Sequence, residues 1–328
     1  MRAVAVALPG GPQVLQVQEI DEPQLRHDQV LIRVHFAAVN RDDISLRQGA
    51  SRFPEHGTLF LGFECSGIIE SVGKSVSNWK IGDKVCALLD GAGYAEKVAV
   101  CEGQVFPIPT GVSMEEAASL PFVACTVWLS VFVTSRLCRG ETLLIHGGWG
   151  GVDAFAIQAA KFYGSRVIVA TVYDDKIGYY LSLDPDVCIN YKTEDFAARV
   201  KEETGGRGVD VILDCIGTPY FQKNIESLNV NGRLFIISTL GATLFTQMDL
   251  KVLVTKRLTV TGGYLHSWCA RSKILIIDDV KKNLWPAIGK EKGMILPLVH
   301  KCFSFSEADE AHRLVETGHQ IGKILLIP

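Results

Sequence analysis

The sequence TLLIHGGWGGVD, residues 142–153, decides the fold that we predict for this chain. Its first five residues are mostly apolar or β-branched and predict a strand, and the glycines that follow predict a tight turn. Apolar residues with helical spacing continue over residues 153–163. Glycines between a strand and a helix let backbone N–H groups approach a pyrophosphate at the helix N-terminus. The stretch therefore predicts a dinucleotide-binding site, and a plain tight turn is the alternative.

Strands and helices alternate after this turn. We expect strands over residues 166–172, 187–190, 209–215, 233–238 and 258–261, and helices over residues 174–183, 195–204 and 220–228. Such alternation is typical of βαβ units, which place parallel strands in one sheet with helices on its faces. This part of the chain therefore predicts a doubly wound α/β domain.

The first third of the sequence is rich in β-branched and alternating runs separated by glycine turns. Strands are expected over residues 4–8, 14–18, 30–36, 66–72, 84–89 and 95–100, which suggests a small barrel. Ser113 followed by Glu115 and Glu116 indicates a helix start. A helix over 271–284 and a strand over 321–327 follow the α/β part, and we expect that strand to rejoin the first domain.

Length and composition limit the class of protein. A chain of 328 residues suggests two domains, and a net charge of −3 gives no basic surplus for binding nucleic acid or anionic membranes. The nine cysteines form no CxxC pair and the eight histidines form no HxH or HExxH pair, so we expect no metal site.

The apolar run 3–8 is too short for a signal peptide, so a cytoplasmic protein is expected. Pro121 and several hydroxyl side chains interrupt the uncharged run 117–135, which predicts a buried helix at a domain junction rather than a membrane span.

Several short motifs carry a resemblance to a known family. They are AVNRDD (38–43), LGFECSG (61–67), GDKV (82–85), GYAE (93–96), INYKTEDF (189–196), GGRGVD (205–210) and GKI (322–324). With these motifs the sequence resembles the zinc-independent quinone oxidoreductase branch of the medium-chain dehydrogenase/reductase superfamily, and is nearest its plant forms. The resemblance covers nearly the whole chain.

The resemblance implies a GroES-like β-barrel catalytic domain over residues 1–122 and a Rossmann NADP-binding domain over residues 123–262. The segment 263–328 would return to the catalytic domain, and the protein would be a homodimer. The implied reaction is the NADPH-dependent reduction of quinones or α,β-unsaturated carbonyls, which are small molecules. Zinc would be absent because Asn40 and Phe63 stand where zinc-using relatives carry cysteine and histidine ligands, and because the four-cysteine lobe is missing.

The resemblance also assigns the cofactor contacts. They fall on Asn40, Thr126, Gly150, Gly151, Val152, Lys176, Tyr191, Leu240 and Lys323. Lys176 and Tyr191 match the family positions around the 2′-phosphate, which favours NADPH over NADH. The alternatives are a solvated helix lysine at 176 and a half-buried aromatic residue at 191.

The implied substrate site departs from the family pattern. The resemblance points to Asn40, Tyr264 and His266 as catalytic residues. It points to Asn40, Ala50, Phe63, Phe122, Leu240 and Tyr264 as the substrate pocket. Ala50 stands where close relatives carry a tyrosine, Phe63 replaces a leucine and Phe122 replaces a glutamate, so the pocket should be more aromatic and less acidic. Plain packing is the alternative for the aromatic residues, and loop capping is the alternative for Asn40.

Two residues at the glycine turn raise a second hypothesis. Asp153 stands where the family carries a third glycine, and Trp149 replaces a small residue. A carboxylate beside a pyrophosphate is unfavourable, and an indole could fill its space. The chain could then be a cofactor-impaired member that acts as a non-redox cyclase or isomerase, or as a binding protein. If both side chains point outward, they do not meet the pyrophosphate, only the backbone contacts it, and the chain still binds its cofactor.

Overall fold

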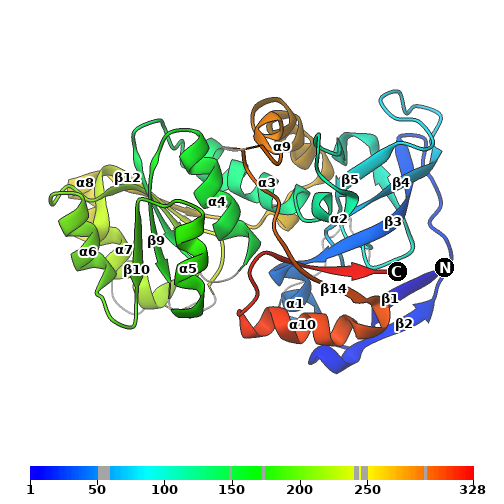
Figure 1. Ribbon diagram of the computed structural model, residues 1–328, viewed down its shortest axis with the longest axis horizontal. Coiled ribbons are helices and arrows are strands. Elements are labelled where there is room, and N and C mark those ends of the chain that lie inside the picture. The colour runs from blue at the N-terminus through cyan, green and yellow to red at the C-terminus, as the bar shows by residue number, and fades with distance from the viewer. Residues whose placement is uncertain (51–59, 148–149, 172–173, 240–243, 245–249, 292–293) are drawn as a thin grey trace. The chain divides into compact units, whose positions relative to one another are not determined.

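The structure, a computed structural model, describes residues 1–50, 60–147, 150–171, 174–239, 244, 250–291 and 294–328. The chain divides into two compact units (Figure 1). Unit 1 comprises Met1–Cys125, His266–Lys292 and Leu296–Pro328, and unit 2 comprises Thr126–Leu265 and Gly293–Ile295. Unit 1 is therefore assembled from segments that lie on both sides of unit 2 in the sequence.

Unit 2 contains a parallel sheet with the strand order β10-β9-β8-β11-β12-β13. Its strands are β8 (Thr142–His146), β9 (Arg166–Thr171), β10 (Val187–Asn190), β11 (Val209–Asp214), β12 (Leu228–Ile236) and β13 (Thr259–Gly262). Each pair runs parallel. The βαβ prediction is thus confirmed.

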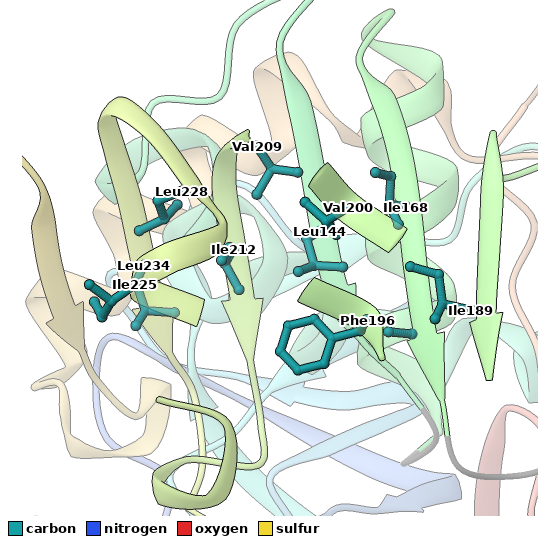
Figure 2. Close-up of a cluster of buried hydrophobic side chains, with 11 residues drawn as sticks. Leu144, Ile168, Ile189, Phe196, Val200, Val209, Ile212, Ile225, Leu228 and Leu234 are labelled. Atoms are coloured by element: carbon teal, nitrogen blue, oxygen red, sulfur yellow. The ribbon is translucent and has the colours of Figure 1, made fainter. Parts of the chain in front are cut away.

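Helices cover both faces of this sheet. They are α4 (Gly151–Phe162), α5 (Asp174–Ser182), α6 (Phe196–Glu203), α7 (Phe221–Ser227) and α8 (Leu250–Lys256). Figure 1 shows α4 and α5 on one face and α6, α7 and α8 on the other. Figure 2 shows how Phe196 and Val200 of α6 and Ile225 of α7 pack on strand residues such as Leu144 and Ile212, all of them buried. Burial of these apolar side chains supplies the main driving force for the unit.

Unit 1 is built on a second, mostly antiparallel sheet with the order β14-β15-β3-β4-β5-β7, in which β6 also pairs with β3. Its strands are β3 (Gln29–Val39), β4 (Glu64–Val72), β5 (Lys84–Leu88), β6 (Lys97–Cys101), β7 (Val105–Pro107), β14 (Val299–Ser304) and β15 (Lys323–Ile327). Strands β1 (Arg2–Val6) and β2 (Leu15–Glu19) form a separate antiparallel pair. The late strand β15 pairs with β3, with Ile324 opposite Val39. The late strand β15 therefore lies in the same sheet as β3.

The remaining helices are α1 (Arg41–Arg47), α2 (Met114–Ala117), α3 (Pro121–Val127), α9 (Ala270–Asn283) and α10 (Ala308–Thr317). The Ser113 side chain accepts a hydrogen bond from the Glu116 N–H at 3.2 Å, as the predicted helix start requires. The buried helix expected over 117–135 is present over a shorter range, residues 121–134. Pro121 begins α3 instead of interrupting a longer helix, because proline suits a first helical turn, and a π-helical turn follows over Trp128–Thr134. In the described part of the chain, no helix has both the length and the apolar character needed to cross a membrane.

Candidate active site

Three polar side chains meet at one end of the unit 1 sheet. Asn40 lies between β3 and α1, Glu64 begins β4, and Lys323 begins β15. Because β3 pairs with both β4 and β15, the three residues converge although they lie far apart in the sequence. All three are buried, with exposed fractions of 5%, 0% and 6%. We call Asn40, Glu64 and Lys323 the Lys323 cluster.

The charges and amide groups of the Lys323 cluster satisfy one another. Lys323 Nζ lies 2.7 Å from Glu64 Oε1 and donates a short hydrogen bond to Asn40 Oδ1. Asn40 Nδ2 donates to Glu64 Oε1 at 3.0 Å, and the Phe122 N–H donates to Glu64 Oε2 at 2.9 Å. Buried ions persist only when they are paired and hydrogen-bonded in this way. The cluster therefore holds a cation and an amide in fixed positions.

Asp43 anchors the backbone beneath the cluster. The Asn40 N–H donates to Asp43 Oδ2 at 2.8 Å, and the Gly62 N–H donates to Asp43 Oδ1 at 2.7 Å. These bonds hold α1 and the turn before Glu64 together. Burial raises the pKa of the Asp43 carboxyl to about 7, although both hydrogen bonds act in the opposite direction.

The raised pKa of Asp43 predicts a pH dependence of stability. The native state holds a proton that the unfolded chain releases near pH 3.8, so the stabilisation is complete below that pH and is lost as the pH rises to about 7. A shift of about three units corresponds to about 4 kcal/mol. Chemical denaturation of the wild type and Asp43→Asn at several pH values between 4 and 8 measures the effect. The free energy of unfolding should fall with rising pH in the wild type alone. The exposed Asp21 gives the control Asp21→Asn, and a slope of equal size in Asp43→Asn would contradict the prediction.

Aromatic rings pack beside the Lys323 cluster. Lys323 Nζ lies 5.6 Å from the centre of the Phe122 ring, and the Phe122 and Phe63 centroids are 6.2 Å apart. The His266 ring stacks on Phe63 at 5.8 Å, and its Nδ1–H donates to Asp42 Oδ2 at 2.8 Å. The cation–π contact with Phe122 is favourable in such desolvated surroundings. The structure thus brings together five predicted site residues: Asn40, Phe63, Phe122, His266 and Lys323.

Ala50, Tyr264 and Leu240 were also predicted for the substrate pocket. Ala50 is exposed. Tyr264 belongs to unit 2 and is 43% exposed. Leu240 lies outside the described residues.

The glycine turn of unit 2 has features that suit a phosphate. Gly150 precedes α4 with φ of 119°, a conformation that disfavours any side chain, and Gly151 and Val152 open the helix. Thr126, also in unit 2, has a buried hydroxyl with no hydrogen-bond partner among the described residues. A helix N-terminus with an uncommitted hydroxyl in the same unit fits a dinucleotide, which would supply anionic and hydroxyl groups.

Asp153 is turned into unit 2 rather than toward solvent. It is buried, its Oδ1 accepts the Ala154 N–H at 2.9 Å, and its Oδ2 accepts the Tyr180 hydroxyl at 2.5 Å. A Cβ added to Gly147 would lie only 3.3 Å from both Asp153 Oδ2 and the Tyr180 hydroxyl. The absent side chain at 147 therefore makes room for this pair. The outward orientation that we considered for Asp153 is wrong, and Trp149 lies outside the described residues.

The two residues expected around a 2′-phosphate are also held inside unit 2. Lys176 is 1% exposed, so it is not a solvated helix lysine. The Tyr191 hydroxyl forms a short hydrogen bond with His146 Nδ1, and its ring stacks on Tyr220 with centroids 4.8 Å apart. His146 Nε2 bonds in turn to Asn224 Oδ1 at 2.6 Å. His146 is therefore a satisfied histidine at a strand end, as its position suggests.

Sequence reasoning missed the roles of Glu64 and Asp42. Glu64 is the only charged residue in the run LGFECSG, and a lone carboxylate at the start of a buried strand is a signal that could have been used. Asp42 gave no such signal because its partner His266 is remote in sequence. Within the described residues, no three His, Cys, Asp or Glu side chains are grouped closely enough to hold a metal ion.

Comparisons with known proteins agree with this architecture. Residues 26–110 match the alcohol dehydrogenase GroES-like domain, and residues 151–276 match the zinc-binding dehydrogenase family. The quinone oxidoreductase of Rattus norvegicus is 27% identical over 330 residues, covering 100% of this chain and 98% of that protein.

Two further relatives cover nearly the whole chain. The acryloyl-coenzyme A reductase of Sulfurisphaera tokodaii is 26% identical over 99% of both chains. A solved structure described as an NAD-dependent alcohol dehydrogenase superposes with a TM-score of 0.85 at 27% identity, covering 100% of both chains. The predicted GroES-like plus Rossmann α/β fold is confirmed. The chain is an oxidoreductase of the medium-chain dehydrogenase/reductase superfamily and belongs to its quinone oxidoreductase-like branch.

Proposed function

We propose that this protein is an NADPH-dependent, zinc-independent reductase of quinones or α,β-unsaturated carbonyls. The Lys323 cluster supports the proposal most strongly, because it fixes a buried cation and an amide beside an aromatic wall. A carbonyl that accepts a hydride develops negative charge on its oxygen, and preorganised donors stabilise that charge. The rat and archaeal relatives, named as quinone and acryloyl-coenzyme A reductases, support the same substrate class.

NADPH, when bound, supplies the hydride. Gly150, Gly151, Val152 and the Thr126 hydroxyl, which has no partner among the described residues, are the unit 2 groups that would hold it. Lys176 and Tyr191 would take the 2′-phosphate, as the resemblance implies. Lys176 is buried, and the hydroxyl of the half-buried Tyr191 is bonded to His146, so both side chains would have to reorient to meet that phosphate.

The residues of unit 1 provide the electrostatic part of the reaction. Asn40 and Lys323 hold the substrate oxygen, and His266, stacked on Phe63, lies on the same aromatic wall. Glu64 keeps the ammonium of Lys323 in place and balances its charge. Solvent supplies the proton that completes the reduction. The ammonium of Lys323 would stabilise the negative charge on the substrate oxygen, as a zinc ion does in zinc-dependent enzymes. We therefore propose that the reaction needs no zinc.

An activity assay tests this function. Purified protein should oxidise NADPH, followed by its near-ultraviolet absorbance, only when a quinone or an enone is added, and more slowly with NADH. A chelator should leave the rate unchanged, and metal analysis should find less than one zinc per chain. An absence of turnover across a panel of quinones and enones would overturn the proposal, and activity lost on chelation would overturn its zinc-independent part.

The buried Asp153 favours a second candidate function, in which the chain no longer uses a cofactor and acts as a cyclase, an isomerase or a binding protein. Its carboxylate lies in the first turn of α4, where a pyrophosphate would also bind. Charge repulsion across this short distance weakens cofactor binding unless the Tyr180 hydroxyl and the helix compensate for it.

Calorimetric titration with NADPH separates the two candidates. For the reductase we expect micromolar binding to the wild type and a tighter complex, by about tenfold, for Asp153→Gly, because one unit of negative charge is removed. A matched control is Asp186→Asn, which removes a carboxylate that pairs with Lys161 elsewhere in unit 2. No binding to the wild type with binding restored in Asp153→Gly would instead support the non-redox candidate.

We also propose that the protein is a cytoplasmic homodimer. Within the described residues β13 is one of the two edge strands of its sheet, and Val260 on it is 37% exposed. An exposed edge strand favours pairing with a second copy across a two-fold axis. Light scattering should give twice the 35.9 kDa chain mass, and Val260→Lys should give one chain mass. A monomeric wild type would contradict this prediction, and the exposed Val230→Lys is the control that should stay dimeric.

A further inference from the structure

Helices α1 and α10 of unit 1 enclose a group of polar side chains that the proposed reaction does not use directly. Figure 1 shows the two helices side by side. Asp43 and Arg47 lie four residues apart on α1 and share one face of that helix. His312 and Glu316 are related in the same way on α10. Tyr94, which lies shortly before β6, completes the group, and all of its members except Glu316 are 0% exposed.

The hydrogen bonds in this group can run in one direction only. Arg47 Nη1 lies 3.3 Å from His312 Nδ1, and a guanidinium group can only donate, so Nδ1 must accept. The ring proton is then on Nε2, which lies 3.2 Å from the Tyr94 hydroxyl oxygen and donates to it. Burial, together with the charge of Arg47, lowers the pKa of His312 to about 3, so the imidazole stays neutral at physiological pH.

The Tyr94 hydroxyl proton is directed at the Asp43 carboxylate. A hydroxyl that accepts the His312 N–H can still donate its own proton. Burial raises the pKa of Tyr94 most, and the charge of Asp43 and its hydrogen bond with the hydroxyl raise it further. The carboxylate also accepts the N–H groups of Asn40 at 2.8 Å and Gly62 at 2.7 Å. The chain of bonds thus ends on the residue that holds the segments before α1 and before β4.

Arg47 fixes the other end of this chain. Its Nε donates to the Gly10 carbonyl at 3.1 Å, and its Nη2 pairs with Glu316, to which Gln48 Nε2 also donates at 2.8 Å. A guanidinium group does not release its proton in proteins. The chain therefore cannot carry a proton from solvent to the candidate active site, and its effect is to hold the Asp43 carboxylate in place.

We propose that Arg47, His312 and Tyr94 are positioning residues for the reaction at the Lys323 cluster. They act through the Asp43 carboxylate, which holds the segments before α1 and before β4 and so sets where the amide and the ammonium of the cluster lie. The inference rests on the proposed function only for its effect on the rate, because the chain of hydrogen bonds can be measured without substrate.

Nitrogen NMR of protein labelled with ¹⁵N-histidine tests the chain directly. We expect His312, assigned from its missing signals in His312→Gln, to show the Nε2–H tautomer alone and no titration between pH 5 and 9. In Arg47→Met the donor to Nδ1 is gone, so the two tautomers should mix or the ring should titrate. The control Arg33→Met removes a guanidinium that pairs with Glu70 at the surface and should leave the His312 signals unchanged. An Nδ1–H tautomer in the wild type would overturn the inference, whether or not Arg47→Met folds.

Removal of the Tyr94 hydroxyl tests its contact with Asp43. The charged and titratable groups that act on this pair, all unchanged in Tyr94→Phe, are Asp42 and Arg47 of α1, Glu64 of β4, Lys323 of β15 and His312 of α10. The lost hydroxyl is a donor to the charged form of Asp43, so its removal favours the protonated form. The fall of the unfolding free energy with rising pH, which ends at about pH 7 in the wild type, should therefore extend about one pH unit further in Tyr94→Phe.

Two comparisons make this result specific. In an Asp43→Asn background, Tyr94→Phe should no longer change the pH dependence, because the titrating group is absent. Tyr163→Phe, which removes a hydroxyl from a half-buried tyrosine of unit 2, should leave the wild-type pH dependence intact. A Tyr94→Phe curve that ends its fall at the wild-type pH would overturn the contact and the inference with it.

Steady-state kinetics measures the effect on the reaction. Tyr94→Phe and His312→Leu should each lower kcat by about 10- to 100-fold and leave KM nearly unchanged, because misplaced donors stabilise the transition state less. His312→Gln keeps one acceptor and one donor, so it should recover most of the rate. Wild-type kcat in Tyr94→Phe and His312→Leu would overturn the positioning role and leave the proposed function standing. If the wild type turns over no quinone or enone, the proposed function fails, whereas the tautomer and the pH dependence still decide whether the chain holds Asp43.

Discussion

Replacing Lys323 by methionine is expected to lower the free energy of unfolding by about 3–5 kcal/mol. The substitution keeps the hydrocarbon stem but leaves Glu64, which is 0% exposed, as a buried carboxylate without its cation. It also removes the hydrogen bond to Asn40 and the contact with the Phe122 ring. Chemical denaturation of the wild type and Lys323→Met at neutral pH measures the loss. We also expect kcat/KM to fall, because the cation beside the substrate oxygen is gone.

Two further variants test the cause of this loss. Lys97 pairs with Glu22 and Glu70 at the surface, where solvent screens the charges, so Lys97→Met should leave the free energy of unfolding nearly unchanged. The double variant Lys323→Met, Glu64→Gln should recover part of the loss, because it removes the uncompensated charge. A loss below about 1 kcal/mol in Lys323→Met, or no recovery in the double variant, would mean that the buried ion pair does not carry this stability.

Replacing Asn40 by alanine is expected to lower kcat by about 100- to 1,000-fold, the range seen when one preorganised donor of an oxyanion site is removed. The Asn40 amide connects Lys323 to Glu64, so its loss also lets the ammonium shift wholly onto the carboxylate. Stability should fall less, by about 1–3 kcal/mol, because buried partners lose a hydrogen bond each. Steady-state kinetics with NADPH and the best enone measures the effect.

The control for Asn40→Ala is another asparagine with a similar contact. Asn78 Nδ2 donates to Glu102 Oε2 at 3.1 Å on the surface, and Asn78→Ala should leave both kcat and KM unchanged. If Asn40→Ala raised KM alone, the amide would contribute binding without selective stabilisation of the transition state. If it changed neither constant, Asn40 would only shape the loop before α1.

The fold could be predicted closely where the sequence pattern is local. Strands β8 and β10 have the bounds expected from their β-branched runs, and α4 begins two residues before the predicted start. The π-helical turn Trp128–Thr134 could not be predicted, because an uncharged apolar run does not distinguish one helical hydrogen-bond pattern from another. Strand β7 is only three residues long and gave no alternation to detect.

The candidate site could be predicted less well, because its contacts are remote in sequence. Asn40 and Lys323 were expected near the cofactor, but nothing local indicated that both would bind Glu64. The sequence also did not indicate that the absent side chain of Gly147 leaves room for the Asp153 carboxylate. This fit depends on where a helix packs against the end of a strand. A pattern along the chain reports which face of an element is buried, whereas partners across a sheet depend on register.

The pairing of β15 with β3 has a consequence for how this protein is made. The ribosome synthesises Asn40 283 residues before Lys323, and the segments of unit 2 emerge between them. The parallel sheet of unit 2 can therefore form while the other sheet still lacks β14 and β15. Until those strands arrive, Glu64 has no cation, and the nascent chain carries an unfinished sheet edge that other chains or chaperones could bind. The Lys323 cluster is thus completed only after all the strands of unit 2 have been synthesised.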